Sequence, residues 1–159
     1  MKMKFVLSLL AGIFLLSACS SDNTTRNDDG EIVEGGDLGV FAVQEGDCVN
    51  FPEGGGDVAS FDAVACEDPH DGEIYELFDI TGFDEYPGDD AVSTQAGEGC
   101  RDAFESFVGI DYDSSVLFFT FLSPSEGTWN DLDDREVICI ITPADGEPQL
   151  TGTTEGAGI

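Results

Sequence analysis

The cysteines constrain the fold of this chain more than any other feature, because each disulfide would join segments that lie far apart in the sequence. Four cysteines, Cys48, Cys66, Cys100 and Cys139, follow a leader that ends at a fifth, Cys19. Four cysteines allow three pairings. We expect Cys48–Cys66, because these two flank a Gly-rich turn. We expect Cys100–Cys139, because a helix packed on a sheet would bring its apolar face to a buried strand.

The cysteine spacing indicates neither a metal centre nor a cofactor. No CxxC pair is present, and the separations match no common zinc module. An even set of cysteines in an oxidising compartment pairs off, so we expect no catalytic thiol either.

The first 18 residues have the composition of a secretory signal peptide. Two lysines precede an apolar run over residues 5–16, which is too short to cross a bilayer, since a crossing needs roughly 20 residues. Leu16-Ser17-Ala18-Cys19 resembles the lipobox of bacterial lipoproteins. The resemblance implies that Cys19 is acylated and anchors the protein to the lipid membrane, on the outer face of the cell membrane.

The charge of the chain excludes one class of partner. Both lysines lie in the leader, so the exported part retains three arginines against 34 acidic residues, a formal charge of −31. Such a surface repels nucleic acid and anionic lipid headgroups, and we expect no nucleic-acid partner. The acidic residues either form a solvated shell or face a cationic partner or Ca²⁺.

Composition divides the exported chain into three parts. Residues 19–39 are polar and rich in Gly and Asp, so we expect a lipidated cysteine followed by a disordered acidic tether. Residues 40–143 hold most of the apolar residues and are expected to form a single small domain. Residues 144–159 are rich in Gly, Thr and Glu, which predicts a flexible tail.

The apolar periodicity of this domain predicts an α+β fold, with one main helix packed on an antiparallel or mixed β-sheet and two disulfides. Apolar residues recur at three- and four-residue steps over 89–108, which indicates the helix, and Gly109 follows its end. Between the last two strands we expect a long loop over 123–135. Strands are predicted at 46–51, 58–66, 73–80, 115–122 and 136–142.

One ordered set of motifs resembles the septum formation domain family of exported and membrane-tethered actinobacterial proteins. The resemblance implies a role near the division septum or cell envelope and supplies no catalytic activity. The family usually has Gly where this chain has Asp133, so we expect a different backbone there, since Gly adopts positive φ more readily. The motifs are Gly46-Asp47-Cys48, Cys66, Pro69-His70, Glu73, Tyr86-Pro87-Gly88, Cys100, Trp129, Asp134-Arg135 and Cys139.

His70 is the only histidine and the residue most open to a chemical interpretation. No G-x-S-x-G elbow and no second histidine accompany it, which argues against a serine triad and a zincin. We expect a structural role, in which Pro69 fixes a turn and the imidazole bonds a backbone carbonyl or the carboxylate of Asp71 or Glu73. The alternative is a ligand contact, or a general base with acidic neighbours.

Glu73, Arg135 and Trp129 join His70 as candidate ligand contacts. Arg135 precedes a buried strand in an acidic chain, which predicts a paired, partly buried guanidinium. Trp129 lies in the predicted loop, where it would cover the end of the core or anchor a partner. Three acidic segments suggest Ca²⁺ sites, although none fits an EF-hand loop: 83–90, 111–115 and 130–136.

These features favour a non-enzymatic, membrane-anchored extracytoplasmic lipoprotein with a binding or structural domain that acts in cell envelope or septum formation. Its partner would be an unknown cell-envelope protein or cell-wall component, cationic if it meets the acidic surface. Two alternatives stay open: a cell-wall hydrolase that uses His70 with its acidic neighbours, and a Ca²⁺-dependent adhesion or sensor module.

Overall fold

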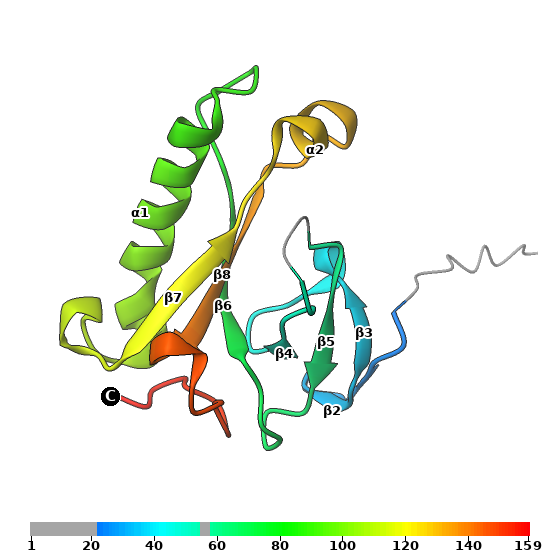
Figure 1. Ribbon diagram of the computed structural model, residues 1–159, viewed down its shortest axis with the longest axis vertical. Coiled ribbons are helices and arrows are strands. Elements are labelled where there is room, and N and C mark those ends of the chain that lie inside the picture. Colours follow the sequence, from blue (N-terminus) through cyan, green and yellow to red (C-terminus); the bar gives the residue numbers. More distant parts are fainter. Residues whose placement is uncertain (1–21, 55–57) are drawn as a thin grey trace, which may run out of the picture.

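The computed structural model describes residues 22–54 and 58–159, so the predicted signal peptide and Cys19 lie outside the described residues. Three short 3-10 helices, η1 (Val40–Ala42), η2 (Tyr112–Ser114) and η3 (Ala144–Gly146), connect the larger elements (Figure 1). In chain order these elements are β1 (Thr25–Arg26), β2 (Ile32–Glu34), β3 (Gly36–Gly39), β4 (Cys48–Asn50), β5 (Ser60–Val64), β6 (Gly72–Asp79), α1 (Asp89–Val108), β7 (Leu117–Leu122), α2 (Glu126–Asp131) and β8 (Glu136–Pro143).

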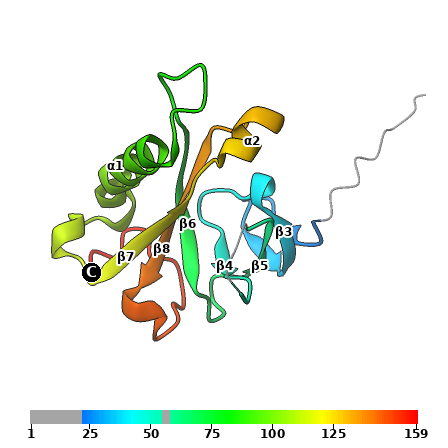
Figure 2. The same ribbon diagram turned by 45° about the horizontal axis from the view of Figure 1, so that its top comes forward.

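The strands form a six-stranded sheet in the order β3-β5-β4-β6-β8-β7, beside a separate β1–β2 pair. Every pairing among the described strands is antiparallel. α1 lies along β6, β8 and β7, whereas β3, β4 and β5 extend to the other side of the molecule (Figures 1 and 2). The predicted α+β architecture with one main helix on a sheet is therefore confirmed, and the sheet is antiparallel.

α1 has the bounds that its apolar period predicts. One stripe of this helix is buried, and its residues are each at most 1% exposed: Val92, Ala96, Cys100, Phe104 and Val108. Two aspartates occupy the first turn, where the helix dipole favours negative charge. Gly109 ends the helix with φ of 86°, and its N–H donates to the Glu105 carbonyl at 2.9 Å.

β8 is the central strand of two cores, because its alternate side chains enter opposite faces of the sheet. Val137, Cys139 and Ile141 pack under α1. Ile138 and Ile140 pack on the other face with apolar residues of β3, β4 and β5. A strand buried on both faces reads as a continuous apolar run, which is why the sequence of β8 lacks alternation.

Both predicted disulfides are present. Cys48–Cys66 joins β4 to the segment after β5 with a Cα–Cα distance of 5.2 Å, and Cys100–Cys139 joins α1 to β8 with 5.5 Å. The sequence separations are 18 and 39 residues. Closing loops of these lengths stabilises the folded chain by about 3 and about 4 kcal/mol on the chain-entropy model.

The expected disordered tether is wrong for residues 22–39, which form β1, β2 and β3 and extend the domain in the N-terminal direction. Ile32 and Leu38 are 6% and 2% exposed and belong to the core on the face of the sheet opposite α1. Arg26 makes a bidentate ion pair with Asp47, at 2.5 and 2.7 Å. The segment is polar overall, but these few buried contacts fix it to the sheet.

The expected flexible tail is also wrong, because residues 147–159 pack back onto the domain. Leu150 forms an antiparallel bridge with His70, and the two N–H···O=C bonds measure 2.9 and 3.1 Å. Further along, Thr154 is buried and its N–H and hydroxyl reach the Glu73 carboxylate. The domain boundary predicted at residue 143 therefore lies too early.

The expected long loop at 123–135 contains the short helix α2. Ser125 caps this helix, since its hydroxyl accepts the Thr128 N–H at 3.1 Å while the Thr128 hydroxyl accepts the Ser125 N–H at 3.0 Å. A Ser-to-Thr cap differs from the usual Ser/Thr-to-Glu/Gln pattern, which explains why the sequence does not indicate it. No helix in the described ranges has both the length and the apolar composition that crossing a membrane requires.

Candidate functional site

A largely apolar groove of about 400 Å³ lies below α2. One wall comes from η1 and the two residues before β5, and the other from the end of β7, the N-terminal part of α2 and the start of β8. We call this set of residues the α2 groove. Its lining residues are Val40, Phe41, Val58, Ala59, Leu122, Ser123, Ser125, Thr128, Asp134, Glu136 and Ile138.

The topology explains why the α2 groove is open. β3 and β7 are the two edge strands of the sheet, and they are not paired with each other. η1 directly follows β3, and Ser123 directly follows β7, so each wall continues one edge of the sheet. Backbone bonds hold both walls in place: Val40 N–H donates to the Ala59 carbonyl at 3.0 Å, and the Ser125 cap fixes α2.

Two carboxylates line the groove at the start of β8. The Glu136 N–H donates to Asp134 Oδ1 at 3.0 Å, which orients Asp134. The carboxylate of Glu136 is partly buried and has no hydrogen bond or ion pair with the described residues. Burial, followed by repulsion from Asp134 and Asp79, raises the pKa of Glu136 above its usual value. A partly desolvated carboxylate without a counter-charge among the described residues, in an apolar groove, is a binding-site candidate.

Arg135, the cation next in sequence to these acids, is engaged elsewhere. Its guanidinium stacks on the Trp129 ring at 3.6 Å from the centroid and pairs with Asp133 at 3.0 Å. It also donates to the Trp129 carbonyl at 3.1 Å. The predicted paired, partly buried guanidinium is confirmed, and the cation does not line the groove.

Trp129 covers the end of the core under α1, which is one of its two predicted roles. Its side chain is 2% exposed and packs against Tyr86 with ring centroids 5.6 Å apart. Its Nε1 has no hydrogen-bond partner among the described residues. Trp129 thus supports α2 from inside, while the neighbouring Thr128 faces the groove.

Asp133 has φ of 56°, which lies in the left-handed region that glycine adopts readily. Asp is among the residues that tolerate this left-handed region best. Its ion pair with Arg135 holds the side chain at the same turn. Asp133 therefore permits a positive φ before β8 and places a carboxylate there.

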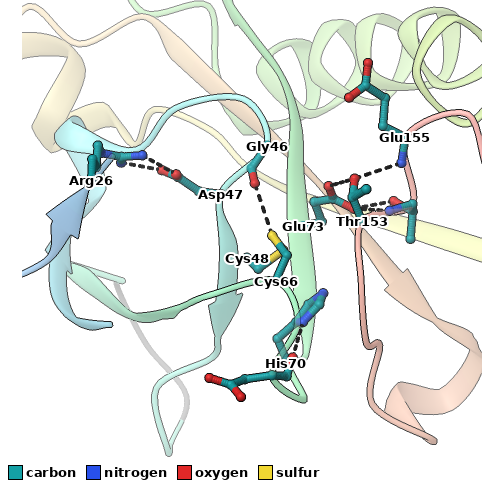
Figure 3. Close-up of a disulfide and its surroundings, with 11 residues drawn as sticks. Arg26, Gly46, Asp47, Cys48, Cys66, His70, Glu73, Thr153 and Glu155 are labelled. Carbon is teal, nitrogen blue, oxygen red and sulfur yellow. Dashed lines mark hydrogen bonds and ion pairs between the residues drawn. A yellow bond between two sulfur atoms is a disulfide. The ribbon is translucent and has the colours of Figure 1, made fainter. Parts of the chain in front are cut away.

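His70 lies far from the α2 groove, beside the Cys48–Cys66 disulfide and the C-terminal segment (Figure 3). The ring is fully buried, and its Nδ1 lies 2.8 Å from the Asp68 carbonyl oxygen. A carbonyl only accepts, so Nδ1 carries the proton. Nε2 is left as a buried acceptor without a partner among the described residues. The predicted bond to a backbone carbonyl is confirmed, whereas Asp71 and Glu73 bond other groups.

Glu73 is fully buried on β6 and holds the C-terminal segment (Figure 3). Its carboxylate accepts hydrogen bonds from the Thr153 hydroxyl at 2.5 Å, the Thr154 N–H at 2.6 Å and the Thr154 hydroxyl at 2.5 Å. These three bonds engage both carboxylate oxygens, so Glu73 acts as a structural anchor. The expected ligand contact finds no support at this residue.

The cysteine spacing predicts no metal centre, but one group of potential metal-ligand atoms lies close together. Ligand atoms of Cys48, Cys66 and Glu73 lie within 4.8 Å of one another. Both sulfurs belong to the disulfide, and metal binding by cysteine needs a thiolate. The three acidic segments considered for Ca²⁺ bring together no comparable group within the described residues.

A second hollow, of about 450 Å³, lies over the Cys48–Cys66 disulfide. Its acidic residues Glu31, Glu45, Glu67 and Glu155 are all exposed to solvent. The only buried carboxylate there is Glu73, whose bonds are already made. The second hollow therefore lacks the desolvated, unpaired group that distinguishes the α2 groove.

Sequence reasoning missed the α2 groove because its walls come from segments far apart in the chain. Phe41 is the second residue of the predicted domain, and Glu136 belongs to an acidic segment and begins a predicted strand. The one available signal was an acidic pair, Asp134 and Glu136, placed where a strongly apolar strand begins. Of the predicted candidates, Arg135 and Trp129 lie near the groove, and His70 and Glu73 lie together elsewhere.

Comparison with known proteins identifies a family for most of the chain. A search of curated proteins and a search of solved structures gave no match. A family model described as septum formation matches residues 43–157. The match includes both disulfides, α1, the C-terminal anchor on Glu73 and most of the α2 groove. This protein therefore belongs to the septum formation family.

Proposed function

We propose that this protein is a non-enzymatic lipoprotein, anchored through acylated Cys19 on the outer face of the cell membrane. Its disulfide-linked domain binds a cell-envelope protein or cell-wall component that takes part in septum formation. One observation carries the proposal: a member of the septum formation family has an apolar groove lined by an unpaired, partly buried carboxylate, Glu136.

The surroundings of His70 support binding rather than hydrolysis. A general base must come within hydrogen-bond reach of a substrate proton. The His70 ring is fully buried, its Nδ1 bonds the Asp68 carbonyl, and it lines neither large hollow. We expect His70→Gln to lower the melting temperature and to weaken binding only as far as the protein unfolds. Loss of a wall-degrading activity at unchanged stability would instead support the hydrolase.

The contacts of the N-terminal segment shorten the tether between Cys19 and the folded domain. Asp22, the third residue after Cys19, already bonds the Gly39 N–H through its side chain at 2.8 Å. Three residues span roughly 10 Å when extended. The proposal therefore places the domain close to the bilayer surface, where a partner in the envelope would approach it from the side or from above.

The test is made in the cells that produce the protein. Ser123→Trp fills the α2 groove, and Ser93→Trp places the same side chain on the exposed surface of α1 as a control. Cys19→Ala should move the protein from the membrane to the soluble fraction. We expect Ser123→Trp and Cys19→Ala to impair septum formation and Ser93→Trp to leave it intact. Normal septa with Ser123→Trp, at normal protein levels, would contradict the proposal.

A further inference from the structure

We propose that the α2 groove binds an extended peptide segment in which an apolar side chain neighbours a lysine or arginine that pairs with Glu136. The inference rests on the proposed binding function and names the chemistry of the partner at that site. It follows from the groove's apolar walls, from the charges that line it and from the free edge of the sheet beside it.

The walls select an apolar side chain. Val40, Phe41, Val58, Leu122 and Ile138 supply hydrophobic surface to the groove. Phe41 is 62% exposed in the free protein, so a ligand would bury a large aromatic surface there. A volume of about 400 Å³ accommodates a few residues of a peptide.

The acidic residues that line the groove favour a cationic side chain next to that apolar side chain. Asp134 and Glu136 are the charged residues that line the groove, and both are acidic. Each arginine of the described chain already has a carboxylate partner: Arg26 with Asp47, Arg101 with Asp113 and Arg135 with Asp133. No arginine of the described residues is therefore left to pair with Glu136, and a cationic ligand would supply its counter-charge. Lysine and arginine also have long alkyl stems that suit an apolar wall.

The direction of the pKa shift of Glu136 agrees with this arrangement. Burial raises its pKa, and the carboxylates of Asp134 and Asp79 raise it further. A cation at the groove would oppose both effects, because an opposite charge nearby favours the ionised carboxylate. The same pair would be less screened by salt than an exposed one, since Glu136 is partly buried.

The sheet topology favours an extended ligand. β7 is an edge strand, and its outer backbone groups have no partner strand among the described residues. Its last residue, Leu122, and the following Ser123 form part of the groove wall. An extended segment entering the groove can thus bond to the strand edge while its side chains fill the pocket.

The test uses the full-length lipoprotein in neutral detergent at physiological salt. The probes are acetyl-Ser-Val-Leu-Lys-Val-Ser-amide and the same peptide with Glu in place of Lys, each carrying an uncharged fluorophore. We expect the lysine peptide to bind at least tenfold more tightly than the glutamate peptide. Glu136→Gln should weaken the lysine peptide about tenfold, which corresponds to about 1.4 kcal/mol. Ser123→Trp should abolish binding.

Glu98→Gln, on the exposed surface of α1, is the matched control, because it removes the same charge away from the groove. It should leave the affinity unchanged, which separates a local ion pair from the attraction of the whole acidic surface. A thermal melt of each variant shows that it is folded. Equal loss with Glu98→Gln and Glu136→Gln, or equal affinity for both peptides, would overturn the inference.

The peptide assay tests the inference on partner chemistry, and the septum assay tests the proposed function, so the two can be contradicted independently. If no lysine peptide binds but Ser123→Trp still impairs septa, the inference on partner chemistry is wrong and the proposed function stands. If the lysine peptide binds as expected but Ser123→Trp cells form normal septa, the inference holds and the proposed function is wrong.

Discussion

Glu73 and Glu136 lie at opposite ends of the same β6–β8 ladder, where Glu73 pairs with Ile141 and Glu136 with Asp79. Glu73 is fully buried, and its carboxylate accepts three hydrogen bonds from the C-terminal segment. Glu136 is partly exposed and has no partner among the described residues. We call these the closed end and the open end of the ladder. The same residue type thus stabilises the fold at one end and leaves a charge available for binding at the other.

The closed end should give the largest loss of stability when its carboxylate is removed. Glu73→Ala leaves the buried Thr154 N–H and two hydroxyls without their acceptor and opens a cavity. We expect the free energy of unfolding to fall by about 3–5 kcal/mol. Urea denaturation with the disulfides intact measures it, and Glu98→Ala on the exposed surface of α1 is the control. A loss below about 1 kcal/mol would remove the contrast between the two ends.

Substitution of Arg26 tests how much its ion pair fixes the N-terminal segment to the stable side of the fold. Its bidentate ion pair reaches Asp47, whose side chain is 2% exposed (Figure 3). Arg26→Ala would leave that carboxylate buried without its cation, which costs about 2 kcal/mol. The same denaturation assay, with Arg101→Ala as the exposed control, measures the effect. If both substitutions cost equally little, the Arg26–Asp47 pair contributes no more than a surface salt bridge does.

Two glycines of α1 test how tightly the helix packs between the two ends. A Cβ on Gly99 would lie 2.3 Å from the Phe78 ring, whereas a Cβ on Gly97 meets nothing nearer than 3.7 Å. We expect Gly99→Ala to destabilise by about 1–3 kcal/mol because the ring must move. Gly97→Ala should stabilise by about 0.5–1 kcal/mol through helix propensity. Thermal melts of the pair compare them directly, and a stabilising Gly99→Ala would show that α1 is loosely packed.

Glu136→Gln should have the smallest effect on stability, and the effect should depend on pH. Because the folded pKa of Glu136 is raised, the folded protein binds this proton more readily than the unfolded chain does. Ionised Glu136 therefore costs stability above its folded pKa, and the cost disappears as pH falls below the unfolded value. We expect Glu136→Gln to melt slightly higher than the parent at pH 7 and at the same temperature near pH 3. A lower melt at pH 7 would make Glu136 a structural residue.

The sequence predicts the elements whose signals are local. The apolar period over 89–108 predicts α1 to the residue, and the Gly-rich turn between Cys48 and Cys66 predicts the first disulfide. It does not predict β2 and β3, because two buried residues, Ile32 and Leu38, hold a segment whose composition is otherwise polar. The average composition of a segment does not indicate which of its side chains are buried in the fold.

The candidate site depends on contacts between distant segments, which a single sequence does not encode as a pattern. Phe41 and Glu136 are 95 positions apart in the sequence and line one groove only in the folded structure. The role of Glu73 was equally hidden, since Thr153 and Thr154 lie in a Gly-rich stretch that resembles a loose tail. In both places the tertiary structure decides whether a carboxylate is satisfied.

The most direct measurement of this contrast is a ¹³C NMR titration of the Glu136 side-chain carboxyl. In the free protein we expect the pKa of Glu136 to lie above the ordinary 4.5 and to fall when the lysine peptide is added. A pKa of about 4.5 that does not respond to the peptide would contradict the claim that the open end of the ladder holds an unpaired carboxylate for a cationic ligand.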